Sequence, residues 1–292
     1  MNRRSFIQKS ALALGGTAMI SLAAFRKQLL GLPNSDTMPL LFVGHGNPMN
    51  AILDNDYSRT WRELGRNLPA PKAILSISAH WLTRGGTKVT STSTPETIHD
   101  FGGFPQQLFD QQYPAPGAPD FARQTIELVQ KTHIEADQSW GLDHGTWSVL
   151  LPMLPEATIP VYQLSIDYSK PPRYHFELAR ELKKLREKGV LIMGSGNLVH
   201  NLRLMANTDQ PYDWTVEFDA KMTAAIDERD FDRVVDFQNL GQLATLAHPT
   251  YDHFLPLLYT LGVVDEKDEI AYFNDSFDLG SVSMRSLLVK RA

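Results

Sequence analysis

Two histidines lie directly after short apolar runs that have the composition of buried β-strands. His45 follows the run at 40–44, and His80 follows the run at 73–79. In an open α/β sheet the carboxyl ends of the strands form the crevice in which ligands bind. Imidazole is the commonest metal ligand among the side chains and titrates near neutral pH. The two histidines therefore predict a metal site at the carboxyl ends of strands.

Two more histidines occupy comparable places further along the chain. His200 follows an expected strand at 190–194 and a turn of small residues. His253 lies on the first turn of a short apolar helix expected over 253–261, with Asp252 as the N-cap. Both positions bring an imidazole to the edge where strands end and helices begin, so both residues are candidates for the site.

A further histidine has surroundings that suit proton transfer. His144 stands in a glycine-flanked turn ahead of a short apolar helix expected over 147–154. Histidine can donate or accept a proton near neutral pH. By contrast, His133 and His175 lie on or beside expected helices among polar neighbours, and we expect both to be solvated.

Several well-known catalytic motifs are missing from the sequence. It has no His-Glu-x-x-His, no Gly-x-Ser-x-Gly, no Walker loop and no Gly-x-Gly-x-x-Gly. Ser195, between two glycines, is interpreted as a turn residue rather than a nucleophile. The chain has no cysteine, so any metal must be held by imidazole, carboxylate or water.

Strand-like and helical patterns alternate along the chain, which predicts an α/β fold. We expect a single domain over 38–292 with a central mixed β-sheet flanked by helices and the metal site at the carboxyl ends of strands. The expected strands cover 40–44, 73–79, 87–92, 159–166 and 190–194, and the expected helices cover 121–131, 147–154, 174–188 and 253–261. The net charge of −5 argues against a nucleic-acid partner.

The segment at 97–119 is rich in glycine, proline and aromatic residues and has no regular period. Loops of this length in a compact domain are usually functional or disordered, and the aromatic residues disfavour disorder. We expect an ordered loop over the site. Phe101 and Phe104, together with Trp81, either line an apolar slot for an aromatic ring or pack in the core.

Residues 1–30 have the character of an export signal. Arg3 and Arg4 precede Phe6 and a weakly apolar stretch at 11–25, the pattern of a twin-arginine signal. An ordinary N-terminal helix or a Sec signal is the alternative. The stretch is shorter than the about 20 residues that span a bilayer. We expect recognition by the twin-arginine export machinery and a periplasmic location, with the signal either cleaved or kept as an anchor.

Taken in order, these motifs resemble the 4,5-DOPA extradiol dioxygenase family, a branch of the LigB-type (class III) ring-cleaving dioxygenases. They include Gly-His-Gly-Asn-Pro around His45 and Ser-Ala-His-Trp around His80. The other matching segments lie at 98–105, 113–117, 140–147, 163–167, 196–203 and 249–259. The apparent export signal departs from the bacterial members and leaves the physiological substrate open.

The resemblance implies one divalent metal ion, iron or zinc, held by three histidines that match His45, His80 and His253. It implies His200 as a further ligand or near-ligand and His144 as a candidate acid or base. The activity that it implies is the insertion of O₂ into a catechol-type, DOPA-like substrate with opening of the ring.

This chemistry needs open positions on the metal, and three neutral imidazoles leave them free. Fe(II) is expected for activity and Zn(II) as a bound ion, because zinc has no redox chemistry. His144 and His200 are the expected catalytic acid and base, in an order that the sequence leaves open. Asp143 and Asn201 are the expected hydrogen-bond partners behind them.

Two other functions fit the same histidines. A metal-binding protein of the same fold without catalysis would have no need for His144 and His200 to converge on the open face. A metal-dependent hydrolase would need a carboxylate base, and the sequence shows no clear one beside the histidines. The oligomeric state is not indicated by the sequence.

Overall fold

The structure is a computed structural model that describes residues 37–208 and 210–292. The twin-arginine signal expected at 1–30 lies outside the described residues. Within the described ranges, no helix combines the length and the apolar character needed to cross a bilayer.

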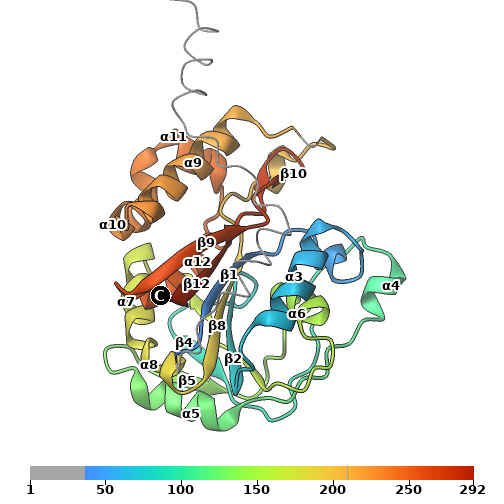
Figure 1. The fold of residues 1–292 in the computed structure, drawn as a ribbon, viewed down its shortest axis with the longest axis vertical. Coiled ribbons are helices and arrows are strands. Elements are labelled where there is room, and N and C mark those ends of the chain that lie inside the picture. Colours follow the sequence, from blue (N-terminus) through green and yellow to red (C-terminus); the bar gives the residue numbers. More distant parts are fainter. Residues whose placement is uncertain (1–36, 209) are drawn as a thin grey trace, which may run out of the picture.

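A six-stranded mixed sheet forms the centre of the domain, in the order β6-β2-β8-β1-β12-β9 (Figure 1). Neighbours among β6, β2, β8 and β1 pair in parallel, whereas β12 pairs antiparallel with both β1 and β9. The strands are β1 (Leu40–Gly44), β2 (Ala73–Ser78), β6 (Val161–Gln163), β8 (Val190–Gly196), β9 (Asp268–Phe273) and β12 (Ser286–Arg291). The expectation of an α/β domain with a central mixed sheet is confirmed.

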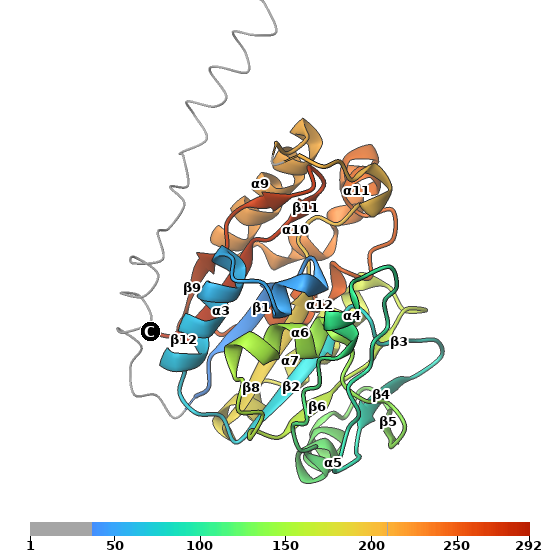
Figure 2. The ribbon, with the colours of Figure 1, turned by 90° about the vertical axis from the view of Figure 1, so that its right-hand side faces the viewer.

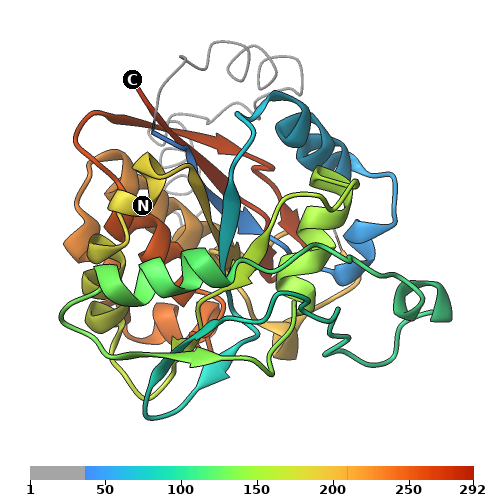
Figure 3. The same ribbon diagram turned by 90° about the horizontal axis from the view of Figure 1, so that it is seen from below.

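Helices cover both faces of this sheet (Figures 2 and 3). On one face, Leu41 and Val43 of β1 share a core cluster with residues of α3 (Asp56–Asn67) and α6 (His144–Met153). On the other face, the core cluster contains Leu40 and Phe42 together with residues of α7 (Pro172–Glu181) and α12 (Leu255–Val263). Since successive side chains of a strand point to opposite faces, burial on both faces explains why the strands are continuous apolar runs.

The remaining elements extend the domain at its edges. Helices α9, α10 and α11 gather at the end of the molecule drawn at the top of Figure 1. The remaining bounds are β3 (Leu82–Thr83), β4 (Thr87–Thr90), α4 (Gln106–Phe109), α5 (Pro119–Leu128), β5 (Ile134–Asp137), β7 (Ile166–Asp167), α8 (Lys184–Glu187), α9 (Asp213–Asp227), α10 (Phe231–Val235), α11 (Gln242–Ala247), β10 (Phe277–Asp278) and β11 (Val282–Ser283), with short 3₁₀ turns η1 (Pro48–Ala51), η2 (Leu202–Leu204) and η3 (Phe237–Leu240).

Several expected boundaries differ from the structure. The strand expected at 159–166 is divided into β6 and β7, which belong to different sheets. The helix expected at 174–188 is divided into α7 and α8. Asp252 is not an N-cap, since α12 begins at Leu255 and Phe254 holds the cap position without a side-chain hydrogen bond.

The expectation that His175 is solvated is wrong. The side chain is fully buried, and its Nδ1 lies 2.9 Å from the hydroxyl oxygen of Tyr259 on the neighbouring α12. Burial lowers the pKa of His175 to about 4. Below its usual pKa of about 6.5, the unfolded chain therefore takes up a proton that the folded chain does not.

This burial predicts a pH-dependent loss of stability. The contribution of neutral His175 is complete above pH 6.5 and is lost as the pH falls from 6.5 to about 4. Over that window the free energy of unfolding should fall by up to roughly 3 kcal/mol more in the wild type than in His175→Phe. Urea denaturation at a series of pH values measures the difference, with exposed His133→Phe as the control. Equal pH slopes in the wild type and His175→Phe would contradict the prediction.

Candidate metal centre and active site

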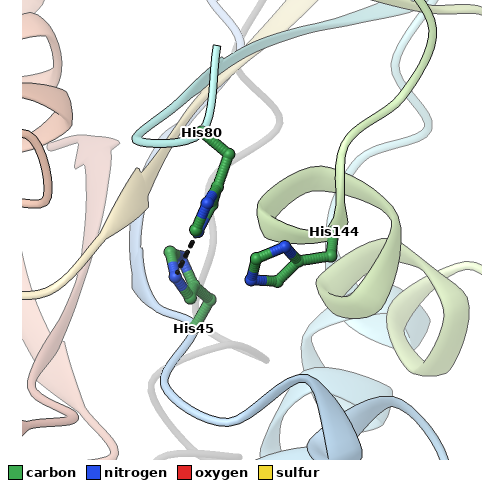
Figure 4. A group of neighbouring side chains, drawn as sticks. All are labelled: His45, His80 and His144. Carbon is green, nitrogen blue, oxygen red and sulfur yellow. Dashed lines mark hydrogen bonds between the residues drawn. The ribbon is translucent and has the colours of Figure 1, made fainter. Parts of the chain in front are cut away.

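Five histidines from separate segments converge beyond the carboxyl ends of β1, β2 and β8. Figure 4 shows three of them, His45 after β1, His80 after β2 and His144 at the start of α6, with their rings pointing toward one another. The ring of His253 lies 5.2 Å from that of His45 and 5.1 Å from that of His80, between centroids. The ring of His200 stacks on that of His253, with centroids 3.5 Å apart. All the histidines proposed from the sequence for this site therefore lie together.

The end of β8 fixes the positions of His45 and His80. This strand lies between β1 and β2 in the sheet. The backbone N–H of His45 donates to the carbonyl of Gly196 at 3.1 Å, and the N–H of Ala79 donates to the carbonyl of Ser195 at 3.0 Å. Because two adjacent carbonyls of β8 hold both chain segments, the two histidines leave the sheet at the same edge.

A glycine allows His253 to approach this edge. A Cβ atom at Gly196 would lie only 2.2 Å from the carbonyl oxygen of His253, so any larger residue there would push the segment before α12 away. The same carbonyl accepts a hydrogen bond from the N–H of Asn197 at 2.9 Å. The close approach of the two backbones therefore places His253 beside the strand ends.

Asp143 holds the start of α6, and with it His144. Its carboxylate is fully buried and accepts hydrogen bonds from the hydroxyl of Ser78 at 2.6 Å and the amide of Gln163 at 2.7 Å. It also caps α6 by accepting from the N–H of Thr146. Burial and the nearby Asp100 raise the pKa of the Asp143 carboxyl, whereas the hydrogen bonds from Gln163 and Ser78 lower it. Asp143 thus joins α6 to the ends of β2 and β6.

This packing predicts that Gly145→Ala disturbs the site. The new Cβ would lie 2.4 Å from Ser78 Oγ and 2.9 Å from the Cδ2 atom of His80. Overpacking of this kind costs about 1–3 kcal/mol of stability, and here the displaced side chain is His80. We expect a lower free energy of unfolding and weaker zinc binding, measured by urea denaturation and by competition with a chromophoric chelator. Gly102→Ala is the control because nothing lies within 4 Å of its added Cβ; equal values for the two variants would contradict the prediction.

The ring nitrogens of His45 can be assigned from their partners. The hydroxyl of Ser195 donates to the carbonyl of Gly145 at 2.5 Å. Since a hydroxyl has one proton, Ser195 must accept from Nδ1 of His45, which lies 3.0 Å away. Nε2 of His45 therefore carries a lone pair. Ser195 lies within β8 and supports His45, so its interpretation as a turn residue is wrong.

Two carboxylates lie near the Nδ1 atoms of three other histidine rings of the cluster. Oδ2 of Asp100 lies 3.4 Å from Nδ1 of His80 and 3.0 Å from Nδ1 of His144. Asp252 Oδ1 lies 3.5 Å from Nδ1 of His253. Nδ1 of His144 and Nδ1 of His253 are buried and make no well-aligned hydrogen bond, so these carboxylate oxygens are polar atoms that face them within 4 Å. The expectation that no carboxylate lies beside the histidines is therefore wrong.

Burial favours the neutral form of four of the five imidazoles. It lowers the pKa of His45 and of His253 well below the usual range, and the neighbouring imidazoles lower both further. Burial likewise lowers the pKa of His80 to about 3 and that of His200 to about 4. Neutral imidazole is the form that binds a metal ion.

The geometry of the cluster fits one metal ion. Nε2 of His45 lies 3.2 Å from Nε2 of His80, and two tetrahedral nitrogen ligands of zinc lie about 3.3 Å apart. A metal at about 2.0–2.1 Å from Nε2 lies about 3.2 Å from the ring centre, so tetrahedral ligands have centroids about 5.2 Å apart. The centroid distances among His45, His80 and His253 are 5.0, 5.1 and 5.2 Å.

The nitrogen positions single out a different third histidine. Donor atoms of His45, His80 and His144 all lie within 4.8 Å of one another. The ring of His144, however, lies only 3.8 Å from that of His80 between centroids, closer than two tetrahedral ligands of one metal would lie. Turning the His253 ring about its Cβ–Cγ bond changes the positions of its nitrogens but leaves its centre in place. We therefore base the ligand set on the centroid distances rather than on the distances between nitrogens.

The remaining residues singled out from the sequence have different surroundings. The ring of Phe101 meets that of His144 edge-on at 5.4 Å, and Phe104 packs against Phe101. Trp81 is buried and stacks on Trp140, so it packs in the core. Asn201 donates to the carbonyl of Leu246 and caps η2 rather than binding a histidine.

Sequence reasoning missed Asp100, Ser195 and Asp252 as partners of the imidazoles. Only Asp252, adjacent in sequence to His253, had a signal for such a role. Asp100 reaches the site from a loop, and nothing in its sequence surroundings indicates which histidine it faces.

The chain is similar to several known proteins. A family model described as "Catalytic LigB subunit of aromatic ring-opening dioxygenase" matches residues 39–282. The chain is 45% identical over 265 residues to "4,5-DOPA dioxygenase extradiol" of Escherichia coli (strain K12), covering 88% of this chain and 96% of that one. It is 35% identical over 252 residues to the Beta vulgaris protein of the same name, covering 84% and 94% of the two chains. A crystal structure of an uncharacterized protein from Escherichia coli K12 superposes with a TM-score of 0.74 at 42% identity, covering 86% of this chain and 99% of that one.

Proposed function

Since this chain belongs to the family of catalytic LigB subunits of aromatic ring-opening dioxygenases, we propose that it opens the ring of a catechol-type, DOPA-like substrate with O₂. Its enzyme class, extradiol ring-cleaving dioxygenase, follows from that membership and from its relatives. The observation that supports the activity most strongly is the buried cluster of imidazoles at the strand ends.

The proposed metal ligands are Nε2 of His45, of His80 and of His253. Their near-equal centroid distances favour this set over one that contains His144. By the same spacing criterion His200, whose ring stacks on that of His253 with centroids 3.5 Å apart, is a near-ligand rather than a fourth ligand in this arrangement. When bound, one divalent ion, Fe(II) in the active enzyme, supplies the redox chemistry and the positive charge that make a catecholate reactive toward O₂.

Protein side chains supply the proton transfers. His144 is the proposed base: within the described residues its Nε2 has no hydrogen-bond partner, and the Asp100 carboxylate lies 3.0 Å behind its Nδ1. His200 is the second proposed proton-transfer group. The presence of both within the cluster distinguishes this proposal from a metal-binding protein without catalysis, which has no use for them.

An apolar wall beside His144 favours an aromatic substrate. Phe101 presents its edge to His144, and Phe104 and Phe109 pack against Phe101 at centroid distances of 5.4 and 5.0 Å. Aromatic rings prefer such edge-to-face contacts. A catechol ring beside His144 would therefore find a matching surface.

The experiment that tests the proposal loads the protein with Fe(II) without oxygen and then adds O₂ and a panel of catechols. We expect a yellow ring-opened product whose mass equals that of the catechol plus O₂, less one water where the new aldehyde condenses with an amine of the same molecule as in DOPA, and no turnover by the zinc-loaded protein. The panel includes DOPA and catechols without its side chain. If iron is shown to be bound and no catechol in the panel yields product, the proposed function is wrong.

We also propose that the enzyme is exported by the twin-arginine route and acts in the periplasm. The proposal is supported by the Arg3-Arg4 pair and the weakly apolar stretch after it. Replacing both arginines with lysine should keep the protein in the cytoplasm, as measured by cell fractionation. Unchanged periplasmic recovery of this variant would contradict the twin-arginine route.

A further inference from the structure

We propose that Asp100 is a positioning residue that sets the orientation and the tautomer of two histidines at once. It holds His80, a proposed metal ligand, and His144, the proposed base, with Nδ1–H outward and Nε2 toward the cluster. This inference rests on the proposed metal site but concerns a residue that neither the ligand set nor the proton transfers include.

The contacts of Asp100 divide between its two oxygens. Oδ1 accepts the backbone N–H of His144 at 2.9 Å, which fixes the carboxylate against the first residue of α6. Oδ2 then faces Nδ1 of His144 at 3.0 Å and Nδ1 of His80 at 3.4 Å. One oxygen therefore serves both rings, whose centroids are 3.8 Å apart.

The charge of this carboxylate selects the tautomer. An ionised carboxylate accepts hydrogen bonds and donates none, so a neutral ring beside it places its proton on Nδ1. Within the described residues, no lysine or arginine lies within ion-pair distance of Asp100 to compete with the two imidazoles.

The site needs this tautomer on both rings. When the proton is on Nδ1, Nε2 has a free lone pair. The lone pair of His80 can then bind a metal ion, and that of His144 can accept a proton from the substrate. Ser195 imposes the same tautomer on His45 by a separate contact. Asp143, the other acid near His144, is bound to Ser78 and Gln163 and does not substitute for Asp100.

The position of Asp100 also connects the site to the aromatic loop at 97–119. The next residue, Phe101, contacts the ring of His144, and the preceding His99 is held by the carbonyl of Gln111 at 3.0 Å from its Nε2. Asp100 is therefore carried by an ordered segment, as a positioning residue must be.

The variant Asp100→Asn tests the proposal with little change in shape. The amide oxygen can still accept the N–H of His144, but the amide nitrogen then donates toward the two Nδ1 atoms. We expect His144 to move its proton to Nε2, and the affinity for zinc to fall about 10–100-fold, the usual effect of losing a partner behind a metal ligand. Asp110→Asn, which removes the same charge from an exposed residue of the same loop, is the control.

Two readouts separate positioning from a general structural role. Competition with a chromophoric chelator gives the zinc affinity, and ¹⁵N NMR of the histidine side chains in the zinc-loaded protein gives the tautomer of His144. A change in both for Asp100→Asn, with neither changed in Asp110→Asn, supports the proposal. A lower melting temperature with unchanged affinity and tautomer overturns it.

Two further outcomes, a variant that does not fold and a wild type that binds no zinc, also lead to a decision. If Asp100→Asn does not fold, Asp100→Ser removes the carboxylate without adding an amide donor and must change both readouts in the same direction; unchanged readouts overturn the proposal. If even the wild type binds no zinc at the cluster, the proposed metal site fails, while the tautomer of His144, then measured in the metal-free wild type and variant, still decides the role of Asp100.

Discussion

Replacing His45 with alanine should abolish both metal binding and ring cleavage. The imidazole is buried, its Nδ1 is engaged by Ser195, and its Nε2 lies 3.2 Å from Nε2 of His80. Removing it takes away one of the three proposed ligands and leaves a cavity that no neighbour fills. The loss of zinc affinity should exceed the roughly 10–100-fold that follows loss of an outer-shell partner.

The measurement compares His45→Ala with His133→Ala, whose side chain is 85% exposed. The control should bind zinc as the wild type does and cleave catechols at the wild-type rate. Both variants are checked for cooperative unfolding, so that misfolding is not mistaken for loss of a ligand. Wild-type zinc affinity in a folded His45→Ala protein would show that the ion binds elsewhere.

The same measurements of zinc binding and catechol cleavage identify the third metal ligand. His253→Ala should lose metal affinity as His45→Ala does, whereas His144→Ala should keep the metal and slow the turnover. The reverse pattern would assign His144 to the metal, as the proximity of its nitrogens to those of His45 and His80 would suggest.

Asp268→Asn should destabilise the whole domain by about 3–5 kcal/mol, because it breaks a buried ion pair. The guanidinium of Arg186 on α8 forms hydrogen bonds to both oxygens of Asp268, at 2.6 and 3.1 Å, and both side chains are fully buried. Nε of Arg186 also donates to the carbonyl of Met38 at 2.7 Å. The pair thus joins the segment before β1, α8 and the start of β9, and an uncompensated guanidinium cannot reach water.

Urea denaturation measures the effect, with Glu177→Gln as the control. Glu177 pairs with Arg180 in the exposed i,i+3 arrangement of α7, and exposed pairs contribute about 0–1 kcal/mol. The double variant Arg186→Met with Asp268→Leu removes both charges and should be more stable than Asp268→Asn alone. Equal free energies of unfolding for Asp268→Asn and Glu177→Gln would contradict the assignment of this pair as a main support of the fold.

Three of the four inner strands could be predicted from the sequence because both of their faces are buried, whereas β12, which lies between β1 and β9, was not among the expected strands. Continuous apolar runs at 40–44, 73–79 and 190–194 correspond to β1, β2 and β8. By contrast, β9 was missed: its middle residues, such as Glu269 and Ile270, are only partly buried or exposed. Such an edge strand is fixed by pairing with β12 rather than by its own pattern.

The histidines could be predicted as a group because each follows a strand or precedes a helix. Their hydrogen-bond partners could not, since those depend on tertiary contacts. Asp100 and His144 are far apart in the sequence and meet only because the loop at 97–119 folds over the start of α6. His175 was misjudged for a related reason: the polar residues beside it in the sequence do not show that α12 packs over its ring.

The most direct test of the central claim is a crystal structure of the zinc-loaded protein with anomalous data collected at the zinc edge. A single anomalous peak about 2.0–2.2 Å from Nε2 of His45, of His80 and of His253 is the predicted result. Asp100 should then lie behind Nδ1 of His80. A peak outside this cluster, or one that touches neither His45 nor His80, would contradict the proposed metal site.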